Sequence, residues 1–128
     1  GDSARKTREQ VSSLDSGSDR VLAYLDAHWR DQIPTAEELQ ALGDWGGVWA
    51  AVIDDFHVPT DEGYGFDSYG TTVIGPDIVP AIEGVQVWVP RLPAARETGA
   101  RRGTGFVLSA GAAARLGDVE SAGLIRVR

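Results

Sequence analysis

The stretch VWAAVIDDF, residues 48–56, decides how the first half of the chain is interpreted. Its large apolar side chains recur at i, i+1, i+4, i+5 and i+8, and they are Val48, Trp49, Val52, Ile53 and Phe56. On an α-helix these positions share one face. The spacing therefore predicts a helix over 48–56, with Asp54 and Asp55 on or beside its outer face.

The residues before this stretch predict a first helix over 19–30. Its apolar side chains form one stripe, made of Val21, Leu22, Leu25 and Trp29, and Ser18 or Asp19 is placed to cap its start.

A second, shorter helix is predicted from Thr35. Thr35 and Glu38 match a capping box, in which the Thr35 hydroxyl accepts the Glu38 backbone N–H and the Glu38 carboxylate reaches back. Leu39 and Leu42 form the inner face, and Gly43 suits the left-handed position at the end.

Beyond Phe56 the composition changes from helix formers to turn formers and β-branched residues. Residues 57–70 predict an acidic, Gly-rich loop with a short strand near 64–66. Strands are expected at 71–74, 85–89, 104–109 and 124–127, with an exposed basic loop at 94–102 and a short helix at 110–116. The fold class is therefore α+β: an N-terminal three-helix unit followed by a small, mostly antiparallel β-sheet. We expect a flexible polar tail at 1–18 and a single domain at 19–128, in which residues 71–128 form the β-rich part.

The composition excludes several classes of protein. The 128 residues include no Cys, which removes disulfide frameworks, thiolate nucleophiles and Cys zinc sites. No apolar run approaches the length of a membrane span, and no stretch has the pattern of a signal peptide. We expect a cytoplasmic protein that does not contact membranes and needs no cofactor.

Charge is sorted along the chain, whose net charge is −7. Residues 31–90 carry eleven acidic side chains and no Lys or Arg, whereas residues 91–128 carry seven Arg against three acids. Either the arginines fold against the acidic segment and cancel it, or the acids share one face and attract a cationic partner. The acidic segment has no cation with which to bind nucleic-acid phosphates.

The leading hypothesis is a small acidic protein-interaction module of the immunity, adaptor or nucleic-acid-mimic type. It would bind a basic protein through the acidic segment 31–83. Acidic side chains of the contact surface would be Asp54, Asp55, Asp61, Glu62 and Asp67. Aromatic anchors from Gly-rich turns would be Trp45, Tyr64 and Tyr69.

A second hypothesis comes from a resemblance. The order of Val21–Leu25, Ile33–Leu39, Leu42-Gly43 and the helix at 48–56 resembles winged helix-turn-helix domains. That resemblance implies a transcriptional regulator whose third helix enters the major groove. The third helix here has Asp54 and Asp55 and no Arg, Lys, Asn or Gln, so DNA contact is expected only from Arg91–Arg102.

A third hypothesis is a metal-assisted hydrolase that uses His57 and the carboxylates near it. The spacing of those acids matches no calcium loop. Ser109 lacks the glycine that a nucleophile elbow needs two residues earlier, where Val107 stands. We therefore assign no catalytic residue and no metal ligand, and an enzyme is not the favoured interpretation.

Overall fold

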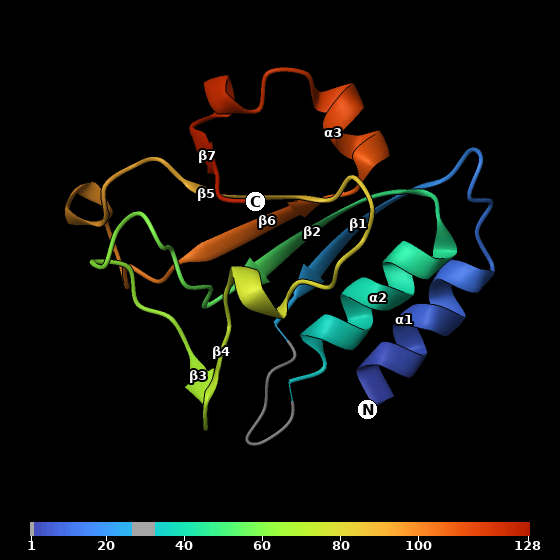
Figure 1. Cartoon of the computed structure of the whole chain (residues 1–128), viewed down its shortest axis with the longest axis horizontal. Coiled ribbons are helices and arrows are strands. Elements are labelled where there is room, and N and C mark those ends of the chain that lie inside the picture. Colours follow the sequence, from blue (N-terminus) through green and yellow to red (C-terminus); the bar gives the residue numbers. More distant parts are fainter. Residues whose placement is uncertain (1, 27–32) are drawn as a thin grey trace.

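The computed structural model describes residues 2–26 and 33–128, and it combines helices with strands (Figure 1). The α-helices are α1 (Asp2–Ser12), α2 (Thr35–Trp45) and α3 (Ala110–Leu116). The strands are β1 (Arg20–Leu25), β2 (Val48–Asp54), β3 (Ser68–Tyr69), β4 (Thr72–Val73), β5 (Gln86–Pro90), β6 (Thr104–Leu108) and β7 (Leu124–Arg126). Short 3-10 segments are η1 (Pro76–Ile78), η2 (Ala94–Arg96) and η3 (Glu120–Ala122).

The main sheet has the strand order β1-β2-β6-β5-β7. β1 runs parallel to β2, and the other neighbours are antiparallel. The register places Leu25 beside Ile53, so β1 and β2 end at the same edge of the sheet. β3 and β4 form a separate small hairpin that turns at Gly70, which has a φ of 61°.

Helices cover both faces of the main sheet (Figure 1). On the face of α1 and α2, alternate residues of β2 pack with α2 in the larger core: Trp49, Ala51, Ile53, Leu39 and Leu42. The intervening β2 residues pack toward α3 in a smaller core, whose members include Val48, Ala50, Leu108 and Ala112. Burial of these apolar surfaces is the main stabilising term of such a fold.

The prediction of a helix over 48–56 is wrong, because residues 48–54 form the strand β2. β2 lies between β1 and β6 and is covered on both faces, so both of its faces are apolar. A strand of this kind lacks the polar–apolar alternation of a half-exposed strand, and a short continuous apolar run is also compatible with a helix.

The prediction of a helix over 19–30 is also wrong where the structure describes the chain, because residues 20–25 form β1. Residues 27–30 of that prediction lie outside the described residues. The three-helix unit is therefore not confirmed: helices and strands alternate here, and the α+β class holds only in its coarser sense.

The polar segment 1–18 contains the helix α1 where we expected a flexible tail. Arg5 lies 2.9 Å from the Glu9 carboxylate one turn further on, a spacing that supports an isolated helix. Ala4 and Val11 are buried and share the face of α1 that packs against α2. Two apolar side chains two turns apart therefore anchor a helix of polar composition.

α2 confirms the predicted helix and its buried Leu39 and Leu42, but its ends differ from the prediction. The Glu38 backbone N–H donates to the Pro34 carbonyl oxygen at 2.9 Å, so the capping box does not form. The left-handed residue at the end is Gly46, with a φ of 76°, rather than Gly43.

Most of the second half of the chain matches the predicted order of elements. β4, β6 and β7 lie within the predicted strands, β5 ends one residue beyond the predicted 85–89, and α3 coincides with the predicted helix 110–116. The short strand predicted near 64–66 is wrong, because Gly65 makes only an isolated bridge with Arg102 and the strand of this loop is β3. The Ser109 hydroxyl begins α3 by accepting the Ala112 backbone N–H at 3.2 Å, and it also accepts the Trp49 N–H at 3.0 Å. Ser109 thus joins α3 to β2, which is a structural role.

The loop that follows β2 is held by a close approach to β6. Phe56 is fully buried, and a Cβ atom on Gly105 would lie 2.5 Å from its ring. A Cβ on Gly103 would lie 2.0 Å from the Phe56 carbonyl oxygen. The backbone N–H of Phe56 also donates to the Gly103 carbonyl oxygen at 3.0 Å. Only glycine lets the two segments approach so closely.

In the part of the chain that the structure describes, no helix has the length and apolar character needed to cross a membrane.

Candidate functional site

Three carboxylates lie together at the C-terminal ends of the parallel strands β1 and β2. Asp26 follows β1, Asp54 is the last residue of β2, and Asp55 comes next. Their carboxylate oxygens lie within 4.8 Å of one another. Like charges at this separation repel, and the repulsion is relieved by a cation or by a proton. We call Asp26, Asp54 and Asp55 the acidic cluster.

Side chains next to the acidic cluster bind two of its members. Arg102 donates from Nε to Asp55 at 2.6 Å, and its guanidinium also pairs with Asp67. The two carboxylates raise the pKa of Arg102, so it stays charged. The Tyr24 hydroxyl donates to Asp54 at 3.1 Å, and this hydrogen bond raises the pKa of Tyr24. One guanidinium from the basic third of the chain thus reaches the acidic segment here.

The acidic residues predicted for partner binding lie in different places. Asp54, Asp55 and Asp67 come together around Arg102 and Tyr24. Asp61 accepts the backbone N–H groups of Ala94 and Gly63, and these bonds lower its pKa. The Asp61 carboxylate therefore holds a turn in place. Glu62 is exposed beside that turn and lies outside the acidic cluster.

The aromatic residues predicted as anchors contact the protein itself. Tyr64 is buried, its hydroxyl donates to the Leu92 carbonyl oxygen, and burial raises its pKa. Tyr69 and Trp45 are half-buried and pack against the larger core. The Tyr64 ring contributes no surface in this conformation, and the role of Tyr69 and Trp45 in partner binding stays a prediction.

His57 does not belong to the acidic cluster. Its ring packs against Phe66 with 4.5 Å between centroids. Its backbone N–H donates to the Ile74 carbonyl oxygen. Carboxylates such as those of the acidic cluster are ligands for hard cations, but acidic clusters are common on surfaces without an ion, and we assign no metal.

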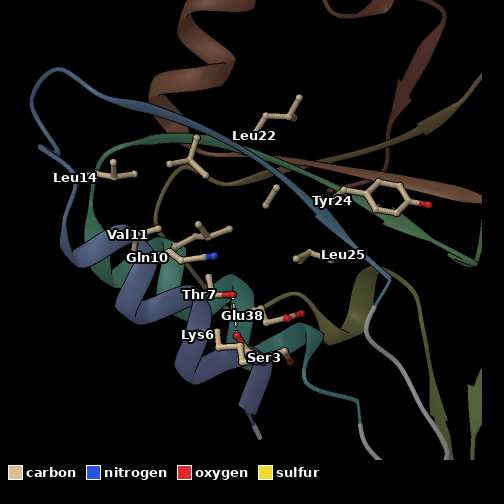
Figure 2. A pocket seen from close by; sticks show the side chains of 13 residues that line it. Ser3, Lys6, Thr7, Gln10, Val11, Leu14, Leu22, Tyr24, Leu25 and Glu38 are labelled. Carbon is tan, nitrogen blue, oxygen red and sulfur yellow. Dashed lines mark hydrogen bonds between the residues drawn. The ribbon is translucent and has the colours of Figure 1, made fainter.

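A groove runs between α1 and the outer side of β1 (Figure 2). Five consecutive residues of β1, 21–25, line it, so the groove follows the strand along its edge. From α1 the lining residues lie on one helical face and are mostly polar: Ser3, Lys6, Thr7, Gln10 and Val11. Its volume of about 520 Å³ lies within the size range of binding sites. We call this space the α1–β1 groove.

Glu38 of α2 lines the α1–β1 groove near the Leu25 end of the strand (Figure 2). It is only 3% exposed, and its Oε2 atom has no hydrogen-bond partner among the residues that the structure describes. Burial raises the pKa of Glu38, while the Ser3 hydroxyl and the positive charge of the N-terminus act in the opposite direction. A buried carboxylate oxygen without a partner costs free energy, which a bound cation or donor would recover.

A second, apolar groove of about 330 Å³ lies on the opposite face of the sheet, between β1 and the segment from α3 to β7. Leu22, which is 76% exposed, and Leu116 are exposed at its rim, and Phe106 lines it. In this part of the chain the apolar surface of the sheet is incompletely covered.

Comparison of the chain with protein-family models, with curated proteins and with solved structures finds no match. The interpretation of the site therefore depends on its geometry.

Sequence reasoning found Asp54 and Asp55 but missed Asp26 and Glu38 as site residues. Asp26 lies before the acidic segment 31–83 and was assigned to the interior of a helix. Glu38 was assigned to a capping box. The sequence does contain a signal for Asp26. Asp26 and Asp54 each follow a short apolar run, and if the two runs are parallel strands, these residues lie side by side.

Proposed function

We propose that the protein is a small acidic interaction module that binds a basic partner protein. The observation that carries the proposal is the acidic cluster, in which three carboxylates lie within 4.8 Å at the shared end of two parallel strands. The surface includes Asp54 and Asp55 of the segment 31–83 and adds Asp26 from outside it.

Electrostatics supports this assignment. The cluster concentrates negative charge on a protein whose net charge is −7. Arg102 offsets part of this charge through Asp55, and a further guanidinium or ammonium group from a partner would reduce the repulsion that remains, while long-range attraction would speed the encounter. Nucleic acid is disfavoured at this surface, because its phosphates would be repelled.

The winged helix-turn-helix hypothesis loses its basis, because two of the three helices in the resemblance are the strands β1 and β2 in the described residues. The hydrolase hypothesis gains no support, because His57 is not part of the acidic cluster. We carry neither forward.

A salt titration with matched variants tests the proposal. The probe is a fluorescent nine-residue peptide rich in Lys and Arg, titrated by anisotropy at about 50 and 300 mM salt. We expect Asp26→Asn with Asp54→Asn to weaken binding about tenfold or more at low salt. The control, Asp77→Asn with Glu83→Gln, makes the same change in net charge at exposed positions elsewhere. Equal weakening by both double variants, or binding that salt does not change, would contradict the proposal.

A further inference from the structure

The outer side of β1 is available for main-chain pairing. Within residues 2–26 and 33–128, β1 is an edge strand of the main sheet and pairs with β2 only. The N–H and C=O groups on its other side therefore face the α1–β1 groove. An edge strand of six residues beside a helix is the arrangement in which extended peptides add to a sheet as a further strand.

The lining of the α1–β1 groove supplies specificity beyond the main chain. At the Leu25 end Glu38 offers a buried carboxylate oxygen that no described residue hydrogen-bonds, and Ser3 and Thr7 lie nearby (Figure 2). At the other end Leu14 and Leu22 provide apolar surface (Figure 2). An occupant matches both ends if it has a cationic side chain near Leu25 and apolar side chains near Leu22.

Charge around the groove favours the same occupant. The Leu25 end of β1 leads directly into Asp26 of the acidic cluster. Lys6 also lines the groove, but its side chain is exposed, so water screens its repulsion of a bound cation. A lysine or arginine that reaches Glu38 would form a charge-assisted hydrogen bond with a carboxylate that is only 3% exposed.

We propose that the α1–β1 groove binds an extended segment of a partner protein as an added strand on β1, with one Lys or Arg side chain of that segment on the Glu38 carboxylate. This inference builds on the proposed function: it names the form of the basic partner and the position of its basic residue.

Selection from a displayed library of randomised nine-residue peptides tests the inference. Wild-type protein is expected to enrich sequences with alternating β-branched residues and a Lys or Arg at one fixed position. For a selected peptide, replacing that basic residue with norleucine should weaken binding about tenfold or more to wild type and much less to Glu38→Gln. Glu83→Gln, an exposed change of the same chemistry outside the groove, serves as the control and should bind like wild type.

Three further measurements separate strand addition from simple charge attraction. Methylation of alternate backbone nitrogens in the peptide keeps its charge and removes donors, and it should abolish binding. Amide NMR signals of Arg20–Leu25 should shift on binding. Gln10→Ala, on the exposed face of α1 in the groove, should weaken binding while leaving the fold intact, as judged by thermal unfolding.

Several outcomes would overturn the inference. The first is a selection in which wild-type protein enriches no peptide. The titration with the Lys- and Arg-rich peptide then decides whether the proposed binding of a basic partner is also wrong. The second is a set of selected peptides that shift the amide NMR signals of Asp26, Asp54 and Asp55 only and bind Glu38→Gln as tightly as wild type. That result would contradict strand addition and leave the proposed function in place. A dimer in sedimentation equilibrium that the selected peptides dissociate would assign the edge to a second copy of this chain.

Discussion

The two edge strands of the main sheet differ in length and in side chains. β7 at one edge has three residues and ends in exposed Arg126. β1 at the other edge has six, and its Leu22 and Tyr24 are 76% and 64% exposed. Short, charged edges resist pairing with other chains, whereas long apolar edges favour it. Of the two edges, that of β1 is therefore the one suited to contact a partner.

Residues beyond the strands increase this difference. The Arg128 guanidinium donates to the carbonyl oxygens of Pro76, Val79 and Pro80, at 3.1, 2.6 and 3.0 Å. These bonds fasten the chain after β7 to the segment around η1. Next to β1 the corresponding space is the α1–β1 groove.

The largest expected effect is on the side chain that fixes β1 to the core. Leu25 is 5% exposed, and Leu25→Ala should lower the free energy of unfolding by about 3 kcal/mol, from lost burial and the cavity that remains. Ile125→Ala on β7, a half-buried position, should cost about 1–2 kcal/mol. Urea unfolding measures both. Equal losses would show that the two edges are held equally firmly.

Arg128→Ala should detach the chain that follows β7. Three carbonyl oxygens lose a charged donor, so we expect a loss of about 1–2 kcal/mol in the free energy of unfolding and faster amide exchange at Val87 and Val127. Arg126→Ala is the control: its guanidinium donates to the Arg128 carbonyl oxygen, and the change should stay within about 0.5 kcal/mol. A similar loss from both variants would refute the role given to Arg128.

Glu38→Gln should stabilise the unliganded protein by on the order of 1 kcal/mol near pH 8, because it removes a buried charge whose Oε2 has no partner. The pKa of Glu38 is raised in the folded state, so wild type loses stability as pH rises from about 4.3 through the raised pKa. The difference between variant and wild type should therefore grow with pH over that range and vanish near pH 4. Urea unfolding at several pH values tests this, and a pH-independent difference would contradict it.

The smallest expected effect is at the surface of β1. Leu22→Thr keeps a β-compatible residue at an exposed position, so stability should change by less than about 0.5 kcal/mol. Self-association at high concentration, followed by light scattering, should nevertheless decrease, because an exposed apolar side chain is lost from an edge strand. Unchanged scattering would show that the edge is already protected by α1.

The sequence predicted the second half of the fold well and the first half poorly, for a physical reason. β5 has β-branched residues between Gly84 and Pro90, and β6 and β7 have them shortly after Gly103 and Gly123, which are strong local signals. β2 is covered on both faces, so every position from Val48 to Ile53 is apolar and the alternation of a strand is absent.

In β1 the same signal is hidden for a different reason. The predicted apolar stripe combines Val21 and Leu25, which pack in the core, with Leu22, which points away from it and is 76% exposed. Apolar side chains on both faces of β1 remove the polar–apolar alternation of a half-buried strand, so the segment resembles an amphipathic helix. The acidic cluster was half predictable: its members from β2 belong to the acidic segment, whereas Asp26 joins them only through the parallel pairing of β1 with β2.

The contact of Phe56 with β6 also constrains how this protein can change over evolutionary time. Every single-nucleotide missense change of a glycine codon introduces a side chain. At position 105 that side chain meets the Phe56 ring, so a smaller residue at 56 must be acquired first. At position 103 the obstacle is a main-chain oxygen, which no substitution at 56 removes. One of these glycines is therefore conditionally replaceable, and the other is fixed for as long as the loop keeps its path.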